Sequence, residues 1–380
     1  MSFFIFIFIF YTLINTYIFI KGWKALSSGS TVLRIIYSLV FFIVYISFTL
    51  AMLGRNQIPL PIQKVAYMMG TGWLAYILYL TLYFLLTDLL YLVNKKNVFI
   101  PKKWTQKTAW SKIQTLSGYI LVSILLSYGY YNFTHPSVVE KDIHISKSGN
   151  QYKDLKIVAF SDLHLGITVD KGRLKKFVQL INTQNPDLIL IAGDIIDNNL
   201  YPLNKEKMWE ELNNLQAPMG VHACLGNHEY LSGIKGSLEF LQRTKLNVLV
   251  DEAILIDESL YIVGRNDQQG GKRSPLDVII KDIDRRKPVI LLDHKPLHLE
   301  DAKKNNIDLQ LSGHTHNGQL FPMNHIVRMI FELPYGYMQD GNTHYYVSSG
   351  LGLWGPQYRI GTRSEIVIFN IKFESSGFSD

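Results

Sequence analysis

The amino-acid composition of the chain changes near residue 135, and this division constrains the fold more than any other feature. Residues 1–135 hold eleven Lys or Arg, one acidic residue (Asp88) and a single histidine at their very end; the remainder carries 27 basic and 30 acidic residues. All eleven histidines lie from His135 onward. Long apolar segments can hide their backbone from lipid only as helices. The sequence therefore predicts a membrane part followed by a water-facing domain.

Four apolar stretches in the first part approach the roughly 18 to 20 residues needed to cross a bilayer. They cover residues 3–20, 32–53, 65–93 and 113–131. We expect a transmembrane region of about four helices over 1–134, a linker over 135–152 and a second domain over 153–380. The net charge of +7 belongs to the membrane part, so no nucleic-acid partner is expected.

The basic residues of the membrane part indicate its orientation. Six of the eleven cluster in the predicted third loop: Lys95, Lys96, Lys102, Lys103, Lys107 and Lys112. Basic loops favour the cytoplasmic side. With four spans, the N-terminus and everything after Tyr131 would then lie outside. The prediction is a multi-pass cell-membrane protein whose second domain is extracytoplasmic.

The second part alternates short apolar runs with segments of helical period, which predicts βαβ units. Five polar motifs follow the predicted strands, where ligands collect in such folds. The motifs are Asp162-Leu163-His164, Gly193-Asp194, Gly226-Asn227-His228-Glu229, Asp293-His294-Lys295-Pro296 and Gly313-His314-Thr315-His316. A lone histidine beside a strand is more often a core residue, but five such motifs in order indicate one site.

The residue types in these motifs favour a pair of divalent cations. Each ion needs three or four side-chain donors, and one carboxylate is short enough to bridge them. The single cysteine, Cys224, excludes thiolate-rich zinc sites and an intrachain disulfide. Ligands of the His, Asp and Asn types suit manganese, iron or zinc.

The five motifs resemble those of the calcineurin-like metallophosphoesterase superfamily over residues 153–373. The segment from Ser348 to Gly355, with Arg359, further resembles its bacterial membrane-associated phosphodiesterase branch, which includes enzymes acting on the pyrophosphate of UDP-2,3-diacylglucosamine. The resemblance implies an α/β fold, a metallophosphoesterase β-sandwich flanked by helices.

Carried over residue by residue, the resemblance implies a complete dinuclear centre. One ion would take Asp162, His164 and His316, and Asp194 would bridge to a second ion held by Asn227, His294 and His314. His228 would be the catalytic residue, with a supporting role for Asn227 as the alternative. The implied reaction is in-line attack on phosphorus by a hydroxide that bridges the metals.

Several residues in or near these motifs have roles that the sequence leaves open. Glu229 could orient His228, and Asp293 could support His294 or cap a solvated strand end. Arg265 and Arg359 are candidates for phosphate contacts, although a structural role is preferred for each. Lys272-Arg273 is interpreted as a solvated charge run.

An apolar pattern after His316 bears on the substrate. Its members are Met323, Ile326, Val327, Ile330 and Phe331. A helix packed on the core is the preferred interpretation, and a lip for an acyl chain is the alternative.

The leading hypothesis is a membrane-anchored phosphoesterase that hydrolyses a phosphodiester or pyrophosphate bond of a lipid or cell-envelope substrate. Nucleotide-linked lipids are made on the cytoplasmic face, so an outward domain would favour phospholipids or envelope-polymer precursors instead. The rival hypothesis is an inactive membrane receptor or scaffold that retains the fold.

Overall fold

The computed structural model describes residues 2–53, 57–147 and 151–373. The chain forms two compact units, one of Met1–Tyr130 with Gly355–Tyr358, the other of Tyr131–Trp354 with Arg359–Asp380. Each unit is described by itself.

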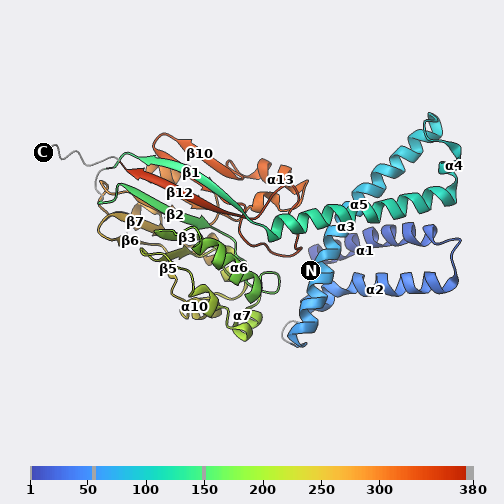
Figure 1. Ribbon diagram of the computed structural model, residues 1–380, viewed down its shortest axis with the longest axis horizontal. Coiled ribbons are helices and arrows are strands. Elements are labelled where there is room, and N and C mark those ends of the chain that lie inside the picture. Colours follow the sequence, from blue (N-terminus) through green and yellow to red (C-terminus); the bar gives the residue numbers. More distant parts are fainter. Residues whose placement is uncertain (1, 54–56, 148–150, 374–380) are drawn as a thin grey trace. The chain divides into compact units, whose positions relative to one another are not determined.

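The first unit is helical and contains the four predicted apolar stretches (Figure 1). Its helices are α1 (Ser2–Ala25), α2 (Thr31–Leu53), α3 (Leu60–Lys96), α4 (Lys102–Thr105) and α5 (Lys107–Thr134). Within the described residues, all of these except α4 are long and apolar enough to cross a membrane. The one acidic residue, Asp88, forms an ion pair with Lys21 and accepts a hydrogen bond from Tyr17. This pairing lowers the cost of an ionised group in an apolar helix.

The second unit is built on two six-stranded sheets. The first has the order β1 (Ser137–Ile145), β12 (Glu365–Phe373), β2 (Asp154–Phe160), β3 (Leu188–Ala192), β4 (Val221–Cys224) and β5 (Asn247–Leu249). The second has the order β10 (Gly336–Asp340), β11 (Thr343–Val347), β9 (Leu309–Ser312), β8 (Val289–Leu292), β7 (Leu260–Gly264) and β6 (Glu252–Ile256).

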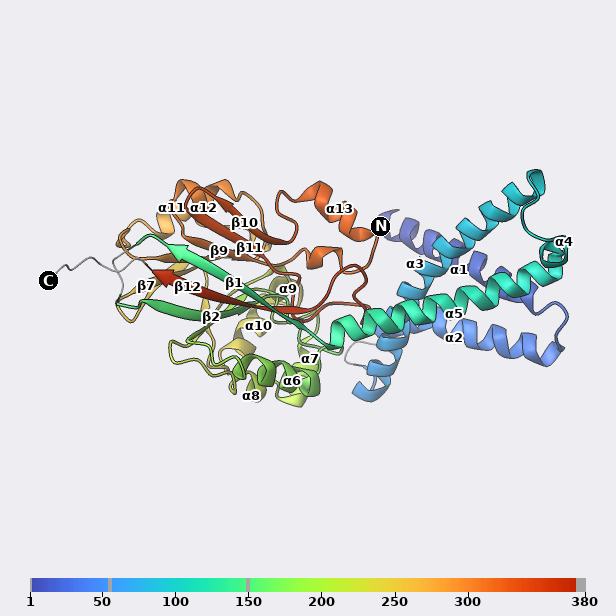
Figure 2. The same cartoon turned by 45° about the horizontal axis from the view of Figure 1, so that its top comes forward.

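Alternating side chains of the strands build three apolar layers. In β2, Ile157 and Ala159 pack between the two sheets, whereas Val158 and Phe160 face the helices outside the first sheet. Those helices are α6 (Lys171–Asn182), α7 (Leu200–Glu206), α8 (Trp209–Leu212) and α10 (Ile234–Leu241). On the second sheet the outer helices are α11 (Leu276–Ile279) and α12 (Glu300–Lys304) (Figure 2). The predicted β-sandwich flanked by helices is confirmed.

Strand β1 lies inside the segment predicted to be a linker, of which residues 148–150 are outside the described part. It pairs in parallel with β12 over its whole length, Ser137 opposite Glu365. Only His135 and Pro136 separate it from α5. The alternating exposed and half-buried residues of β1 carry a weak signal, because an edge strand buries little until its partner strand is known.

Candidate metal centre

The predicted ligands come from the ends of five strands. Strands β2, β3 and β4 run parallel, as do β8 and β9, so their carboxyl ends gather at one edge of each sheet. Asp162, His164 and Asp194 each have a positive φ near 50°, which turns the chain sharply where it leaves the strand. Gly193 (φ +79°) precedes Asp194, and a Cβ there would lie 2.7 Å from Nδ1 of the His294 ring. A glycine is therefore required at this position.

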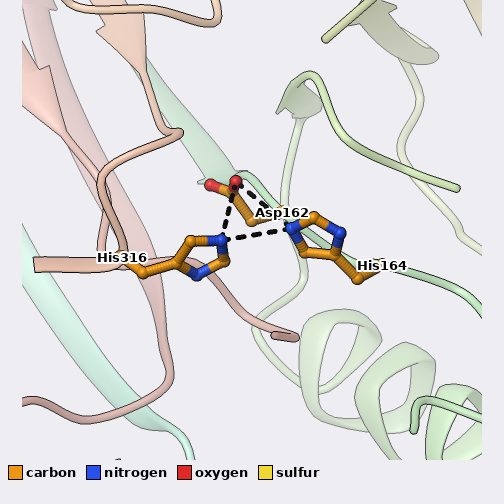
Figure 3. Close-up of side chains that lie close together, drawn as sticks. All are labelled: Asp162, His164 and His316. Atoms are coloured by element: carbon orange, nitrogen blue, oxygen red, sulfur yellow. Dashed lines mark hydrogen bonds and ion pairs between the residues drawn. The ribbon is translucent and has the colours of Figure 1, made fainter. Parts of the chain in front are cut away.

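The first predicted ligand set converges as a buried cluster (Figure 3). Nε2 of His164 lies 3.1 Å from Nε2 of His316 and 3.6 Å from a carboxylate oxygen of Asp162. The same oxygen lies 3.4 Å from His316. Asp162 is also held by Oγ of Ser161 and by the backbone N–H of His314. The three side chains thus point one donor atom each into a single small space.

The carboxylate of Asp194 joins this cluster to the rest of the predicted set. Its Oδ2 lies 3.7 Å from Nε2 of His164 and 3.1 Å from Nε2 of His294. Asp194, His294 and His314 form a second group whose donor atoms all lie within 4.8 Å of one another. Asp194 therefore stands between two groups of donors.

Helix α9 (Asn227–Leu231) supplies the remaining two predicted residues. Oδ1 of Asn227 is buried and lacks a hydrogen-bond partner among the described residues, as expected of an oxygen available to a cation. The backbone N–H of His228 donates to Asp194 Oδ1 at 2.8 Å. Nδ1 of His228 lies 3.0 Å from the carbonyl oxygen of Asp197. Because a carbonyl only accepts, Nδ1 carries a proton.

Electrostatics at the site favour a cation. Burial raises the pKa of Asp162 and Asp194, but the neighbouring histidines outweigh it, and both carboxyl pKa values lie below their usual range. Burial lowers the pKa of His164 and His294, yet the surrounding carboxylates raise each to about 10. Burial lowers the pKa of His314 to about 4, which keeps that imidazole neutral. Ionised carboxylates, a neutral imidazole and the unpartnered oxygen of Asn227 fit divalent ions.

Asp197 is a site residue that the sequence analysis missed. Its buried carboxylate lies 3.6 Å from Nδ1 of His164 and 3.4 Å from Nδ1 of His228. It touches one predicted ligand and the predicted catalytic residue at once. The signal was an acidic residue three positions after Asp194, behind the apolar pair Ile195-Ile196.

Within the described part of the chain, the carboxylate of Glu229 hydrogen-bonds to the backbone and not to the ring of His228. Its carboxylate accepts hydrogen bonds from the backbone N–H of Ile196 at 2.9 Å and of Gly226 at 2.7 Å. It thereby links the loop after Asp194 to the turn before Asn227. Burial, aided by the charge of Asp194, raises the pKa of Glu229 to about 7.

Asp293 supports neither His294 nor a solvated strand end. It is buried and forms ion pairs with Arg265, at 3.4 Å, and with Arg273. The interpretation of Arg273 as part of a solvated charge run is wrong, because its guanidinium meets this buried carboxylate. The preferred structural role of Arg265 agrees with this pairing. His294 instead directs Nδ1 at the carbonyl oxygen of Ala192, 2.8 Å away.

Arg359 is completely buried and supports the loop behind the site. Its Nη2 donates to the carbonyl oxygens of Gly350 and Gly352. The backbone N–H of Gly352 in turn donates to the carbonyl oxygen of Asp162 at 2.8 Å. Arg359 is therefore a structural residue, as preferred above. The same loop brings Trp354, 49% exposed, to 6.5 Å from the ring of His228.

Helix α13 (Met323–Ile330) contradicts its preferred interpretation. All eight of its residues are described and none is buried, so a helix packed on the core is the wrong prediction. The period-3.6 pattern alone cannot tell a face covered by protein from one that remains uncovered.

The two-sheet sandwich carries buried Asp, His and Asn side chains at its strand ends, and these donor types suit divalent cations. The model of the calcineurin-like phosphoesterase family matches residues 155–318. A metallophosphoesterase of Aquifex aeolicus is 38% identical over 226 residues, 58% of this chain and 85% of the relative. One of Campylobacter jejuni is 37% identical over 261 residues, 67% of this chain and 68% of the relative. The chain belongs to the calcineurin-like metallophosphoesterase family and is of the phosphoester hydrolase class.

Similarity to a membrane relative covers a comparable share of the chain. The zebrafish (Danio rerio) "transmembrane protein with metallophosphoesterase domain" is 29% identical over 276 residues, 68% of this chain and 63% of the relative. Together with the four long apolar helices, this name supports membrane association.

Proposed function

We propose that the protein is a membrane-anchored dinuclear phosphoesterase that hydrolyses a phosphodiester or pyrophosphate bond of a lipid or cell-envelope substrate. One observation carries the proposal: the carboxylate of Asp194 stands between the group of Asp162, His164 and His316 and the group of His294 and His314. We assign the first group to one ion, the second group with Asn227 to the other, and Asp194 to both. Manganese, iron and zinc all suit these donors.

When bound, two divalent ions neutralise the phosphoryl oxygens and lower the pKa of the attacking water. The protein's own contribution centres on His228. The carbonyl oxygen of Asp197 keeps the proton on Nδ1, so Nε2 is the atom available to the substrate. We assign Nε2 the task of stabilising the transferring phosphoryl group or protonating the leaving oxygen. Proton donation from Nε2 requires the imidazolium form of the ring, and the carboxylate of Asp197 lies 3.4 Å from Nδ1.

Two features support a lipid or envelope substrate. Within the described residues the chain has four helices of membrane-spanning length, and only two residues lie between the last of these helices and strand β1. A connection this short suits a substrate that is itself held in the membrane. The basic third loop favours an outward catalytic unit, and hence phospholipids or envelope-polymer precursors.

The side of the membrane has a direct test. Lys281, whose side chain is 68% exposed, would be replaced by cysteine and treated in intact cells with a membrane-impermeant thiol reagent. Cys224 is buried and burial raises its thiol pKa, so it should stay unlabelled. We expect the cysteine at position 281 to be labelled in intact cells. Protection in intact cells, with labelling after lysis, would reverse the orientation and favour a nucleotide-linked lipid.

The function itself is tested with purified full-length protein. Metal-replete protein should hydrolyse a generic aryl phosphodiester, and activity should vanish on chelation and return with manganese. Absence of turnover by protein that holds two ions would favour the inactive receptor or scaffold.

A further inference from the structure

We propose that the uncovered face of α13, with Phe321 before it, is a lipid-contact surface that receives the acyl chains of a membrane-resident substrate beside the metal centre. This inference rests on the proposed function and deepens it. It assigns a binding surface to residues that carry no predicted metal or catalytic role.

Both ends of α13 are fixed beside predicted metal ligands. At its start, a Cβ on Gly318 would overlap the backbone of Asn324, so the helix packs directly on the turn that holds His316. At its end, the ring of Phe331 lies 6.1 Å from that of His314. Just beyond, Oγ1 of Thr315 donates to the carbonyl oxygen of Pro334 at 2.6 Å. The helix therefore lies beside the reactive centre.

One face of the helix presents large apolar side chains to solvent. Met329 is 86% exposed, Ile330 63% and Ile326 49%, and their i, i+3, i+4 spacing places them on one face. At about 100° per residue, Ile326 lies roughly 200° around the helix from Asn324, the residue that packs on Gly318. Phe321, immediately before the helix, is 46% exposed. A water-facing helix would not be expected to gather such side chains on one side.

The occupant that fits is lipid, because the chain arrives from its last apolar helix at the same edge of the catalytic unit. Glu365 is paired in register with Ser137, the first residue of β1. The carboxylate of Glu365 also accepts a hydrogen bond from Tyr335, 2.8 Å away and five residues after α13.

The last turn of α5 is fixed at this edge too. Phe133 is fully buried in the outer core of the first sheet, and Asn132 donates to the carbonyl oxygen of Arg359. Within one unit, the end of α5 therefore meets the segment that follows α13. Arg359, which supports the loop behind the predicted ligands, lies at the same place. An apolar helix at this place suits the acyl chains of a lipid substrate that resides in the membrane.

A site-directed probe tests this directly. Full-length protein with Met329→Cys, labelled with a fluorophore, would be reconstituted into phospholipid vesicles containing acyl-chain spin-labelled lipids. Val278 on α11 is also an exposed aliphatic residue (52%), so Val278→Cys is the matched control. We expect the label at position 329 to be quenched several-fold more than the label at 278. Equal quenching would overturn the proposal, and so would efficient disulfide cross-linking of two Met329→Cys copies without quenching, which would assign the face to a second copy.

Activity provides a second test. The triple variant Ile326→Asn, Met329→Gln, Ile330→Asn should lower the ratio of long-chain lipid phosphodiester to soluble aryl phosphodiester hydrolysis by about 10-fold, a loss of about 1.4 kcal/mol of discrimination. Val278→Asn should keep the ratio of the unaltered protein. An unchanged ratio in the triple variant would contradict the lipid surface. Failure of the unaltered protein to hydrolyse either substrate would instead refute the proposed function, whereas the quenching experiment would still test α13.

Discussion

Nδ1 of His228 lies 3.0 Å from the backbone carbonyl oxygen of Asp197 and 3.4 Å from its carboxylate. The carbonyl oxygen fixes the proton on Nδ1, and the two contacts together hold the orientation of the ring. The same carboxylate lies 3.6 Å from His164, one of the predicted ligands. One side chain therefore couples the predicted acid to the predicted metal cluster.

This relationship predicts different effects for two substitutions. His228→Gln should lower kcat toward an aryl phosphodiester by about 10²- to 10⁴-fold, because the proton donor is lost. Asp197→Asn should lower kcat by roughly 10- to 100-fold, because the side chain of Asp197 orients His228 and does not itself contact the substrate. Steady-state kinetics with measured metal content check both. Asp282→Asn, at a side chain that is 86% exposed, is the control and should keep full activity. A full-rate Asp197→Asn enzyme would contradict the coupling.

The proposed bridging role of Asp194 predicts a loss of metal. Asp194→Ala should lower the metal content from the two ions that we propose to below one per chain, because both ions would lose a ligand. Elemental analysis of purified protein measures this. His222→Gln is a suitable control, since His222 hydrogen-bonds to the carbonyl oxygen of Met219 and not to the site. Two ions retained in Asp194→Ala would contradict its bridging role.

The seven predicted ligands could be recognised from sequence because each follows a strongly apolar strand, and strand ends meet at one edge of a sheet. The structure brings them together, although their roles remain a proposal. Asp197 escaped notice because its partners come from loops far apart in the chain. Strand β1 escaped notice because only its pairing with the distant β12 makes it a strand. The interpretation of α13 failed because amphipathic spacing does not specify what covers the apolar face.

The surroundings of His222 predict that the free energy of unfolding depends on pH. Nε2 of His222 lies 2.9 Å from the carbonyl oxygen of Met219 and Nδ1 lies 3.3 Å from the side-chain nitrogen of Asn247, a pattern that only the neutral ring satisfies. Burial lowers its pKa below the ordinary 6.5. The folded state therefore binds this proton less well than the unfolded state. The stability from His222 is present above pH 6.5 and is lost as the pH falls through the folded pKa.

Thermal unfolding at pH 7.5 and pH 5 measures this effect. Unaltered protein should lose more stability between these pH values than His222→Gln, whose side chain does not titrate. Equal losses in the two proteins would show that His222 contributes no pH dependence.

We expect substitution of Arg359 to weaken both the fold and the predicted metal site. Arg359→Met removes donors to two carbonyl oxygens in the loop that holds the backbone of Asp162, and should lower the free energy of unfolding by about 2–3 kcal/mol. We also expect weaker metal retention during dialysis. Arg286→Met, at a side chain that is 85% exposed, is the control and should leave the free energy of unfolding unchanged. Undiminished stability and metal retention in Arg359→Met would contradict the supporting role.

The most direct test of the central claim combines metal counting with turnover in the same sample. Full-length protein in detergent would be stripped, reloaded with manganese, analysed for bound metal and assayed with an aryl phosphodiester beside the His228→Ala variant. We predict two ions per chain in both proteins, turnover in the unaltered protein and at least about a 100-fold lower kcat in the variant. Equal turnover in the two proteins, or no turnover by unaltered protein that holds two ions, would contradict it.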